Sequence, residues 1–93
     1  MMERELRFGE TLRTQSSVVG TWIKTPSPIV CEVLSRTALD VLVLDTEHAP
    51  FGRAELDGCI AISRALGKPV LVRVPDASAA NILNALEIGR AHV

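Results

Sequence analysis

Three side chains that can carry charge follow directly on an apolar run. Residues 41–44 read Val-Leu-Val-Leu, and Asp45, Glu47 and His48 come next. An Asp and a His three positions apart on one turn can hydrogen-bond, and the carboxylate then fixes the imidazole tautomer and raises its basicity. This spacing predicts an acid/base pair, Asp45 and His48. A polar turn with a capping Asp and a solvated His is the other interpretation that the spacing leaves open.

A positive charge interrupts a second apolar run. Arg73 lies near the carboxyl end of the segment 70–74, which reads Val-Leu-Val-Arg-Val. An unpaired charge on a buried strand is costly, so we expect Arg73 to face a carboxylate or a bound anion. The residues alone allow two interpretations: an anion-binding Arg73, or a structural salt bridge from Arg73 to Asp45 or Glu47.

The segments around these side chains predict an α/β fold. Four apolar residues in a row, two of them β-branched, are typical of a strand buried on both faces, as in parallel sheets. We expect strands at 18–23, 41–45 and 70–74, and helices at 3–13, 28–37, 53–66 and after a cap at Asp76 or Ser78, the last carrying Ile82, Leu83 and Leu86. The alternation predicts right-handed βαβ crossovers and a parallel sheet, whose carboxyl edge is where catalytic residues collect.

Length decides how much of such a fold can form. A doubly wound sheet and a (β/α)₈ barrel both start with this pattern, and a barrel typically needs about 250 residues. The 93 residues of this chain can supply only three of eight barrel strands. The barrel interpretation therefore predicts the first three βα units of an incomplete barrel, with residues 1–93 forming the N-terminal part of one domain.

Composition excludes several classes of function. The net charge of −1 and the three aromatic residues give no case for a nucleic-acid partner. No apolar stretch approaches the roughly 18–20 residues that span a bilayer, so no membrane partner is expected. Cys31 and Cys59 stand among apolar residues of predicted helices and fit small core side chains in a reducing cytosol. With no signal peptide at the N-terminus, a cytoplasmic location is expected.

Several segments together resemble the HpcH/HpaI aldolase family, the class II pyruvate aldolases of the 4-hydroxy-2-oxoheptanedioate aldolase type. The resemblance covers nearly the whole chain from about residue 18, and Leu-Asp-Thr-Glu-His-Ala-Pro at 44–50 carries most of it. Thr46 stands where the family usually has Gly. The other matching positions are Gly20-Thr21-Trp22, Glu32, Asp40, Val72-Arg73-Val74-Pro75 and the helix 81–86.

This resemblance implies a barrel enzyme, usually a homo-oligomer, that cleaves 4-hydroxy-2-oxo acids to pyruvate and an aldehyde. It implies His48 as the acid/base group, Asp45 as its orienting partner, and Arg73 as the group that binds the pyruvyl oxygens and stabilises the enolate. Trp22 could line the substrate pocket or pack in the core, and Glu47 receives no catalytic role. The family also implies a divalent metal, Mg²⁺, Mn²⁺ or Co²⁺, whose ligands are expected beyond residue 93.

Other interpretations remain at this stage. The chain could belong to a citryl- or malyl-CoA lyase-like enzyme, or it could be a small α/β binding or receiver-like module with Asp45 as its functional acid. Residues 87–93, Glu-Ile-Gly-Arg-Ala-His-Val, also match one reading frame of a common sequencing adapter, which suggests a non-native tail. Because three βα units leave sheet edges and an apolar face open, we expect the 93-residue polypeptide to be inactive alone and marginally stable or self-associating.

Overall fold

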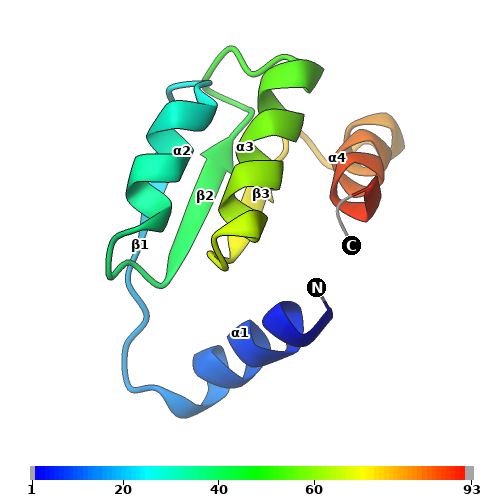
Figure 1. The fold of residues 1–93 in the computed structure, drawn as a ribbon. Coiled ribbons are helices and arrows are strands. Elements are labelled where there is room, and N and C mark those ends of the chain that lie inside the picture. Colours follow the sequence, from blue (N-terminus) through cyan, green and yellow to red (C-terminus); the bar gives the residue numbers. More distant parts are fainter. Residues whose placement is uncertain (1, 92–93) are drawn as a thin grey trace.

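The computed structural model describes residues 2–91 of the chain, with side-chain burial for residues 8–88. Three parallel strands form one open sheet, and helices alternate with them (Figure 1). The elements are α1 (Met2–Thr14), β1 (Gly20–Ile23), α2 (Pro28–Ser35), β2 (Val41–Asp45), α3 (Arg53–Ala65), β3 (Val70–Arg73) and α4 (Ala79–Ala91). The predicted order of strands and helices is therefore confirmed.

The element boundaries differ from the predicted ones by a few residues, for local reasons. The helix expected to reach residue 37 ends at Ser35, because the amide and the hydroxyl of Thr37 both donate to the carbonyl of Leu34 and close the chain into a turn. At the start of α4, Ser78 acts as the predicted cap, since its hydroxyl accepts from the amide of Asn81. The carboxylate of Asp76 accepts from the amide of Ser78 and supports this cap.

The sheet has the consecutive order β1-β2-β3, so that β2 lies between its two neighbours. Four of the five residues of β2 are buried, as its continuous apolar run predicts. The register pairs Ile23 with Leu44, and Asp45 with Arg73. The carboxyl ends of β2 and β3 therefore meet at one edge, and this places the two charged side chains next to each other.

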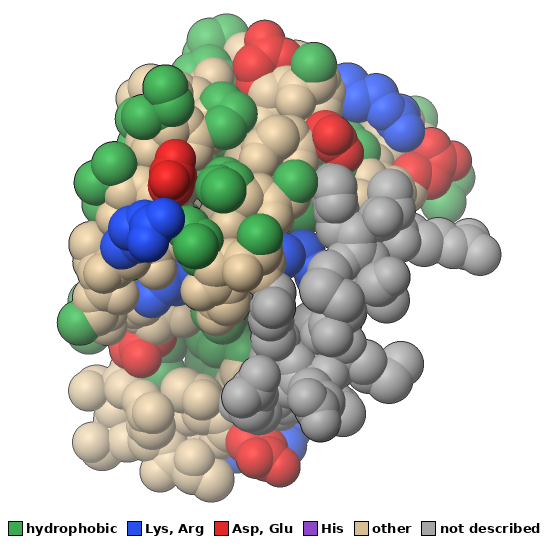
Figure 2. Space-filling view, viewed as in Figure 1, with side chains coloured by type: hydrophobic (Ala, Val, Ile, Leu, Met, Phe, Trp, Pro, Cys, Tyr) green, Lys and Arg blue, Asp and Glu red, His purple; other side chains and the backbone are tan. Residues whose placement is uncertain are grey.

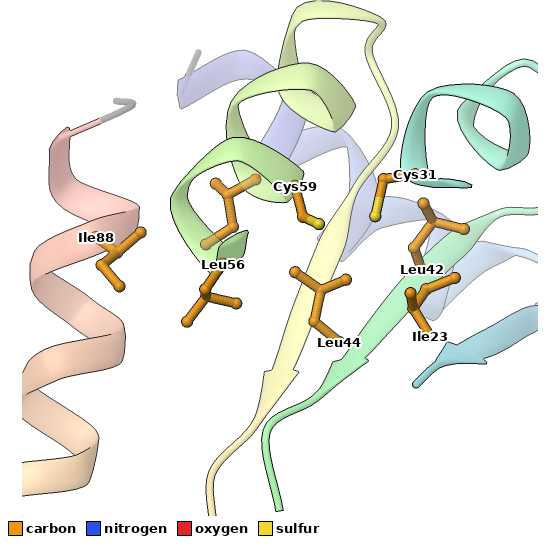
Figure 3. Close-up of a cluster of buried hydrophobic side chains, with 8 residues drawn as sticks. Ile23, Cys31, Leu42, Leu44, Leu56, Cys59 and Ile88 are labelled. Atoms are coloured by element: carbon orange, nitrogen blue, oxygen red, sulfur yellow. The ribbon is translucent and has the colours of Figure 1, made fainter. Parts of the chain in front are cut away.

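The core lies between the sheet and the helices on one of its faces (Figure 3). Strand residues Leu42 and Leu44 meet Cys31 of α2 and Cys59 of α3, and Ile88 of α4 reaches the same cluster. Both cysteines are free and buried, as predicted. On α3, the buried residues are Leu56, Cys59, Ile60 and Ser63.

Helix α4 buries few of its apolar side chains. Ile82, Leu83 and Leu86 are all exposed, and Ile88 is the buried apolar residue of this helix among residues 79–88. Glu87 forms an ion pair with Arg53 of α3 at 3.6 Å. The suggested non-native tail thus includes two residues that contact α3 or the core, while His92 and Val93 lie outside the described residues.

Apolar side chains also remain on surfaces that other elements would have to cover. Trp22, Val43 and Leu71 are register partners on the sheet face away from the core, and Trp22 and Leu71 are about half exposed. On α2, Ile29 and Val33 point outward, and Figure 2 shows apolar side chains scattered over this side of the molecule. Within residues 2–91, no helix combines the length and the apolar character needed to cross a membrane.

The close approach of β1 to β2 depends on Gly20. A Cβ atom at this position would lie 2.5 Å from Cγ1 of Val41 and 2.8 Å from its carbonyl oxygen. The second contact is to the backbone of the central strand, so rotation of a side chain cannot relieve it. Any larger residue would therefore push the two strands apart.

We expect Gly20→Ala to lower the free energy of unfolding by about 1–3 kcal/mol, the usual cost of overpacking a tight site. Urea unfolding followed by the fluorescence of Trp22, the single tryptophan, measures this loss. Gly9→Ala is the matched control, because its Cβ would meet Arg13 at 3.7 Å, an ordinary contact in a helix. Equal stability of the wild type and the Gly20→Ala variant would contradict the close-approach argument.

Candidate active site

The carboxyl edge of the sheet brings together side chains from all three strands or the turns that follow them. Trp22 comes from β1, Asp45 from the end of β2, and Arg73 from the end of β3. Glu47 and His48 follow Asp45 on the turn before α3. The structure thus gathers the four residues that the sequence singles out, Trp22, Asp45, His48 and Arg73.

Asp45 and Arg73 form a two-pronged ion pair. Nε of Arg73 donates to Oδ1 of Asp45 at 3.1 Å, and Nη2 donates to Oδ2 at 2.5 Å. This is the geometry in which a planar guanidinium matches a carboxylate best. Asp45 is fully buried, so the pair supplies the charge that burial requires.

The backbone of the turn adds to this stabilisation. Oδ1 of Asp45 also accepts the amide N–H groups of Glu47 and His48, each at 3.0 Å. Short-range bonds of this kind explain why an Asp ends the strand, since its side chain organises the two residues that follow. The hydrogen bond from Arg73, reinforced by these amides, holds the pKa of Asp45 far below its usual range. The same contact with Asp45 raises the pKa of Arg73.

The imidazole of His48 meets Arg73 more closely than Asp45. Its Nδ1 lies 2.7 Å from Nη2 of Arg73 and 3.4 Å from Oδ2 of Asp45. The two residues of the predicted acid/base pair are therefore neighbours, and the backbone amide of His48 donates to the carboxylate of Asp45. The imidazole itself, however, contacts the guanidinium of Arg73 more closely than it contacts this carboxylate. His48 has a side chain that is 56% exposed and can be reached from solvent.

The ring of Trp22 packs against the guanidinium of Arg73. Cζ of Arg73 lies 4.2 Å from the centroid of the Trp22 ring, a cation–π contact. Trp22 lies on the sheet face away from the core and is half exposed. Trp22 therefore does not pack in the core, and its place in a substrate pocket stays a prediction.

Glu47 and Thr46 make contacts with His48 and Arg73 that the sequence predicted only in part. The carboxylate of Glu47 lies 3.5 Å from Nε2 of His48 and 3.6 Å from Nε of Arg73. The amide and the hydroxyl of Thr46 both donate to the carbonyl of Arg73, at 3.0 and 2.6 Å. Thr46 therefore fixes the backbone that carries Arg73, and its departure from the usual Gly was the available signal for this role.

The described residues do not fit a metal centre. No group of three or more His, Cys, Asp or Glu side chains that could hold a metal ion occurs in the described part of the chain. Both oxygens of Asp45 already accept hydrogen bonds from Arg73, and one of them accepts two amides as well. The ligands expected beyond residue 93 remain a prediction.

A hollow of about 210 Å³ lies on the other side of the strand ends, between α3 and α4. Thr46, Leu56 and Ile88 are among its lining residues, together with Asn81 and Asn84, whereas Asp45, His48 and Arg73 are not. The hollow is therefore separate from the cluster of charged residues. Asp45, His48 and Arg73 lie on the side of the sheet that Trp22 occupies.

Comparison with known proteins shows what this arrangement resembles. No family model matches the chain. The 5-keto-4-deoxy-D-glucarate aldolases of Salmonella paratyphi A and Salmonella newport are each 35% identical to it over 83 residues, which is 89% of this chain and 32% of theirs. The chain thus spans about a third of the length of the curated relatives it matches.

Solved structures give the same picture. The HpcH/HpaI aldolase from Desulfitobacterium hafniense DCB-2 superposes with a TM-score of 0.77 at 29% identity, over 87% of this chain and 32% of that one. A HpcH/HpaI aldolase/citrate lyase family protein from Burkholderia cenocepacia J2315 gives 0.77 at 26% identity, over 88% and 33%. Macrophomate synthase gives 0.72 at 29% identity, over 92% and 30%.

The ion pair at Asp45 predicts a stability that depends on pH. Because the pKa of Asp45 is lowered in the folded chain, its contribution is complete above the ordinary carboxyl pKa of about 3.9 and is lost as the pH falls below that value. Asp45→Asn removes this contribution. The variant should be less stable than the wild type at pH 7, and the difference should shrink between pH 4 and pH 2.

Thermal unfolding followed by circular dichroism from pH 7 to pH 2 measures this change. Glu32→Gln is the matched control, because Glu32 is an exposed carboxylate whose ion pair with Arg36 lies on the surface of α2. Parallel stability curves for the wild type and Asp45→Asn would show that the ion pair does not stabilise the fold.

Proposed function

We propose that this chain supplies three βα units and part of the active site of an aldolase that cleaves 4-hydroxy-2-oxo acids to pyruvate and an aldehyde. The chain resembles the HpcH/HpaI aldolases in sequence and fold over about a third of their length. The observation that carries this proposal is the convergence of Trp22, His48 and Arg73 at the carboxyl edge of the sheet. The relatives are aldolases, and the substrate class is the part that we propose.

Arg73 is the proposed binding group for the 2-oxo acid. Its charge is permanent, its side chain is a third exposed, and Asp45 and Trp22 hold it in place from two sides. When the C3–C4 bond breaks, negative charge develops on the oxygen of the pyruvate enolate. A fixed guanidinium beside that oxygen stabilises the charge without any reorganisation of solvent.

His48 is the proposed acid/base group. Cleavage begins when a base removes the proton of the 4-hydroxyl, so that the aldehyde can leave with its carbonyl formed. A solvent-accessible imidazole beside the anion-binding residue fits this task. The buried carboxylate of Asp45 would orient the imidazole, and Trp22 would line the pocket on the side of β1.

The family resemblance also implies a divalent metal, Mg²⁺, Mn²⁺ or Co²⁺, that would act as a Lewis acid when bound. The described residues do not form such a site, so every step above uses only side chains of this chain. Homo-oligomeric assembly and a cytoplasmic location are further expectations from the sequence.

Sheet topology argues against a receiver-like module. A receiver-like doubly wound sheet has the order 2-1-3-4-5, with its first strand between the second and third. Here β2 occupies that central position, as consecutive strands do around a barrel. A citryl- or malyl-CoA lyase-like enzyme would share the fold, and the aldolase is preferred because the curated relatives are aldolases.

A chimera tests the proposal. The matching third of the Salmonella paratyphi A aldolase is replaced by this chain, and aldol cleavage is measured by the release of pyruvate from a 4-hydroxy-2-oxo acid. We expect an active chimera. His48→Ala and Arg73→Ala should each lower its kcat/KM by about 10²–10⁴-fold, the usual contribution of a positioned acid/base or oxyanion group.

Two controls accompany this experiment. Glu32→Gln on the surface of α2 should leave the activity of the chimera unchanged, and the 93-residue chain alone should show none. A chimera that stays fully active after both His48→Ala and Arg73→Ala would contradict the proposed roles.

A further inference from the structure

The contacts of Arg73 determine which nitrogen of His48 carries a proton. A guanidinium has N–H donors and no acceptor, and it does not lose its charge in proteins. Nη2 of Arg73 lies 2.7 Å from Nδ1 of His48, so Nδ1 must accept this hydrogen bond with its lone pair. The imidazole is therefore neutral, with its proton on Nε2.

The other contacts of the ring agree with this tautomer. Nε2 of His48 faces Oε1 of Glu47 at 3.5 Å, and a carboxylate accepts and does not donate. On the opposite side, Oδ2 of Asp45 lies 3.4 Å from Nδ1 but already accepts from Nη2 of Arg73 at 2.5 Å. Arg73 and Glu47 thus favour a proton on Nε2, and Asp45 is the neighbour that could accept a proton from Nδ1 once Arg73 has left.

This tautomer is the wrong one for the proposed reaction. A base that works through Nε2 needs a free lone pair there, with the proton on Nδ1 donated to Asp45. Nδ1 cannot donate to Asp45 while it accepts from Arg73. The resting contacts and the acid/base role of His48 therefore exclude each other.

We infer that Arg73 holds His48 in an inactive tautomer until a small 2-oxo acid or a similar oxyanion draws the guanidinium away from Nδ1. This inference rests on the proposed function of the same site. Once Arg73 turns to the oxyanion, Nδ1 takes a proton from water and keeps it in a hydrogen bond to the Asp45 carboxylate, while Nε2 gives its own proton to water. The net charge of the ring does not change, and Nε2 becomes a free base only when substrate is bound.

The surroundings of Arg73 suit such a movement. Its side chain is a third exposed, and its contact with Trp22 lies on the open face of the sheet. Thr46 fixes the backbone of Arg73 through two hydrogen bonds, so the side chain can move without the strand. Nε can keep its bond to Oδ1 of Asp45 while Nη2 leaves His48.

Nitrogen NMR of the imidazole tests this inference directly. The 93-residue chain is labelled with ¹⁵N-histidine, and two-bond ¹H–¹⁵N correlations identify the protonated nitrogen of His48 at a pH where the ring is neutral. Solid-state spectra give the same shifts if the chain self-associates. We expect the Nε2–H form in the wild type.

Two variants release the ring in different ways. Arg73→Ala removes the donor, and Arg73→Lys keeps a positive charge for the buried Asp45 but loses the fork that also reaches His48. In both variants the ratio of the Nδ1–H to the Nε2–H form should rise by about tenfold, as the loss of a charge-assisted hydrogen bond implies. Arg73→Lys keeps the test valid if Arg73→Ala does not fold.

Three further samples complete the test. Arg36→Ala, a surface change at the C-cap of α2, should leave the tautomer unchanged. Arg73→Lys/Asp45→Asn should return the ring to Nε2–H, because an uncharged amide then replaces the carboxylate that would accept from Nδ1. Excess pyruvate should shift the wild type toward Nδ1–H. The Nδ1–H form in the wild type without ligand, or the same tautomer in the wild type and Arg73→Lys, would overturn the inference. An unchanged wild-type spectrum in pyruvate would overturn release by the oxyanion.

Failure of the tautomer switch and failure of the proposed function give different results. A chimera that loses activity on His48→Ala while Arg73→Lys leaves the tautomer unchanged would keep the aldolase role and remove the tautomer switch. A tautomer that changes in Arg73→Lys, together with an inactive chimera, would keep the tautomer switch and remove the aldolase role.

Discussion

The buried ion pair between Asp45 and Arg73 is the interaction on which the site depends. Asp45 has no exposed surface, so its charge requires a partner, and the register of β2 with β3 places Arg73 directly beside it. The same carboxylate accepts two amides of the turn and thereby sets the path of the chain that carries His48. One side chain thus joins two strands and shapes the turn between a strand and a helix.

This arrangement shows why a structural and a functional interpretation of Arg73 do not compete. The guanidinium makes the salt bridge to Asp45 that burial demands, and it also presents a donor to Nδ1 of His48 and a face to Trp22. Because a guanidinium has five donors in one plane, it can satisfy a buried carboxylate and still have a donor for another group. A lysine could compensate the charge but could not hold all these partners in place.

Much of this could be predicted from the sequence, because the signals were local. The apolar run 41–44 and the cap at Ser78 each depend on neighbouring residues, and the parallel order of strands follows from alternation. Comparison with solved aldolases confirms the predicted resemblance to this family and the fold of the three βα units. Local patterns could not show that Arg73 would lie between Asp45 and His48, because this contact joins positions 25 and 28 residues apart. The exposure of Ile82, Leu83 and Leu86 was missed for the same reason, since it depends on what packs against α4.

We propose that the carboxyl edge holding Asp45, His48 and Arg73 binds a small 2-oxo acid. A crystal structure of the chimeric aldolase with oxalate, a mimic of the pyruvate enolate, tests it most directly. The account predicts an oxalate oxygen within hydrogen-bond distance of the Arg73 guanidinium, with Trp22 beside the ligand and Nδ1 of His48 turned to Asp45. Oxalate bound elsewhere, with Arg73 still in contact with His48 and Asp45 alone, would contradict it.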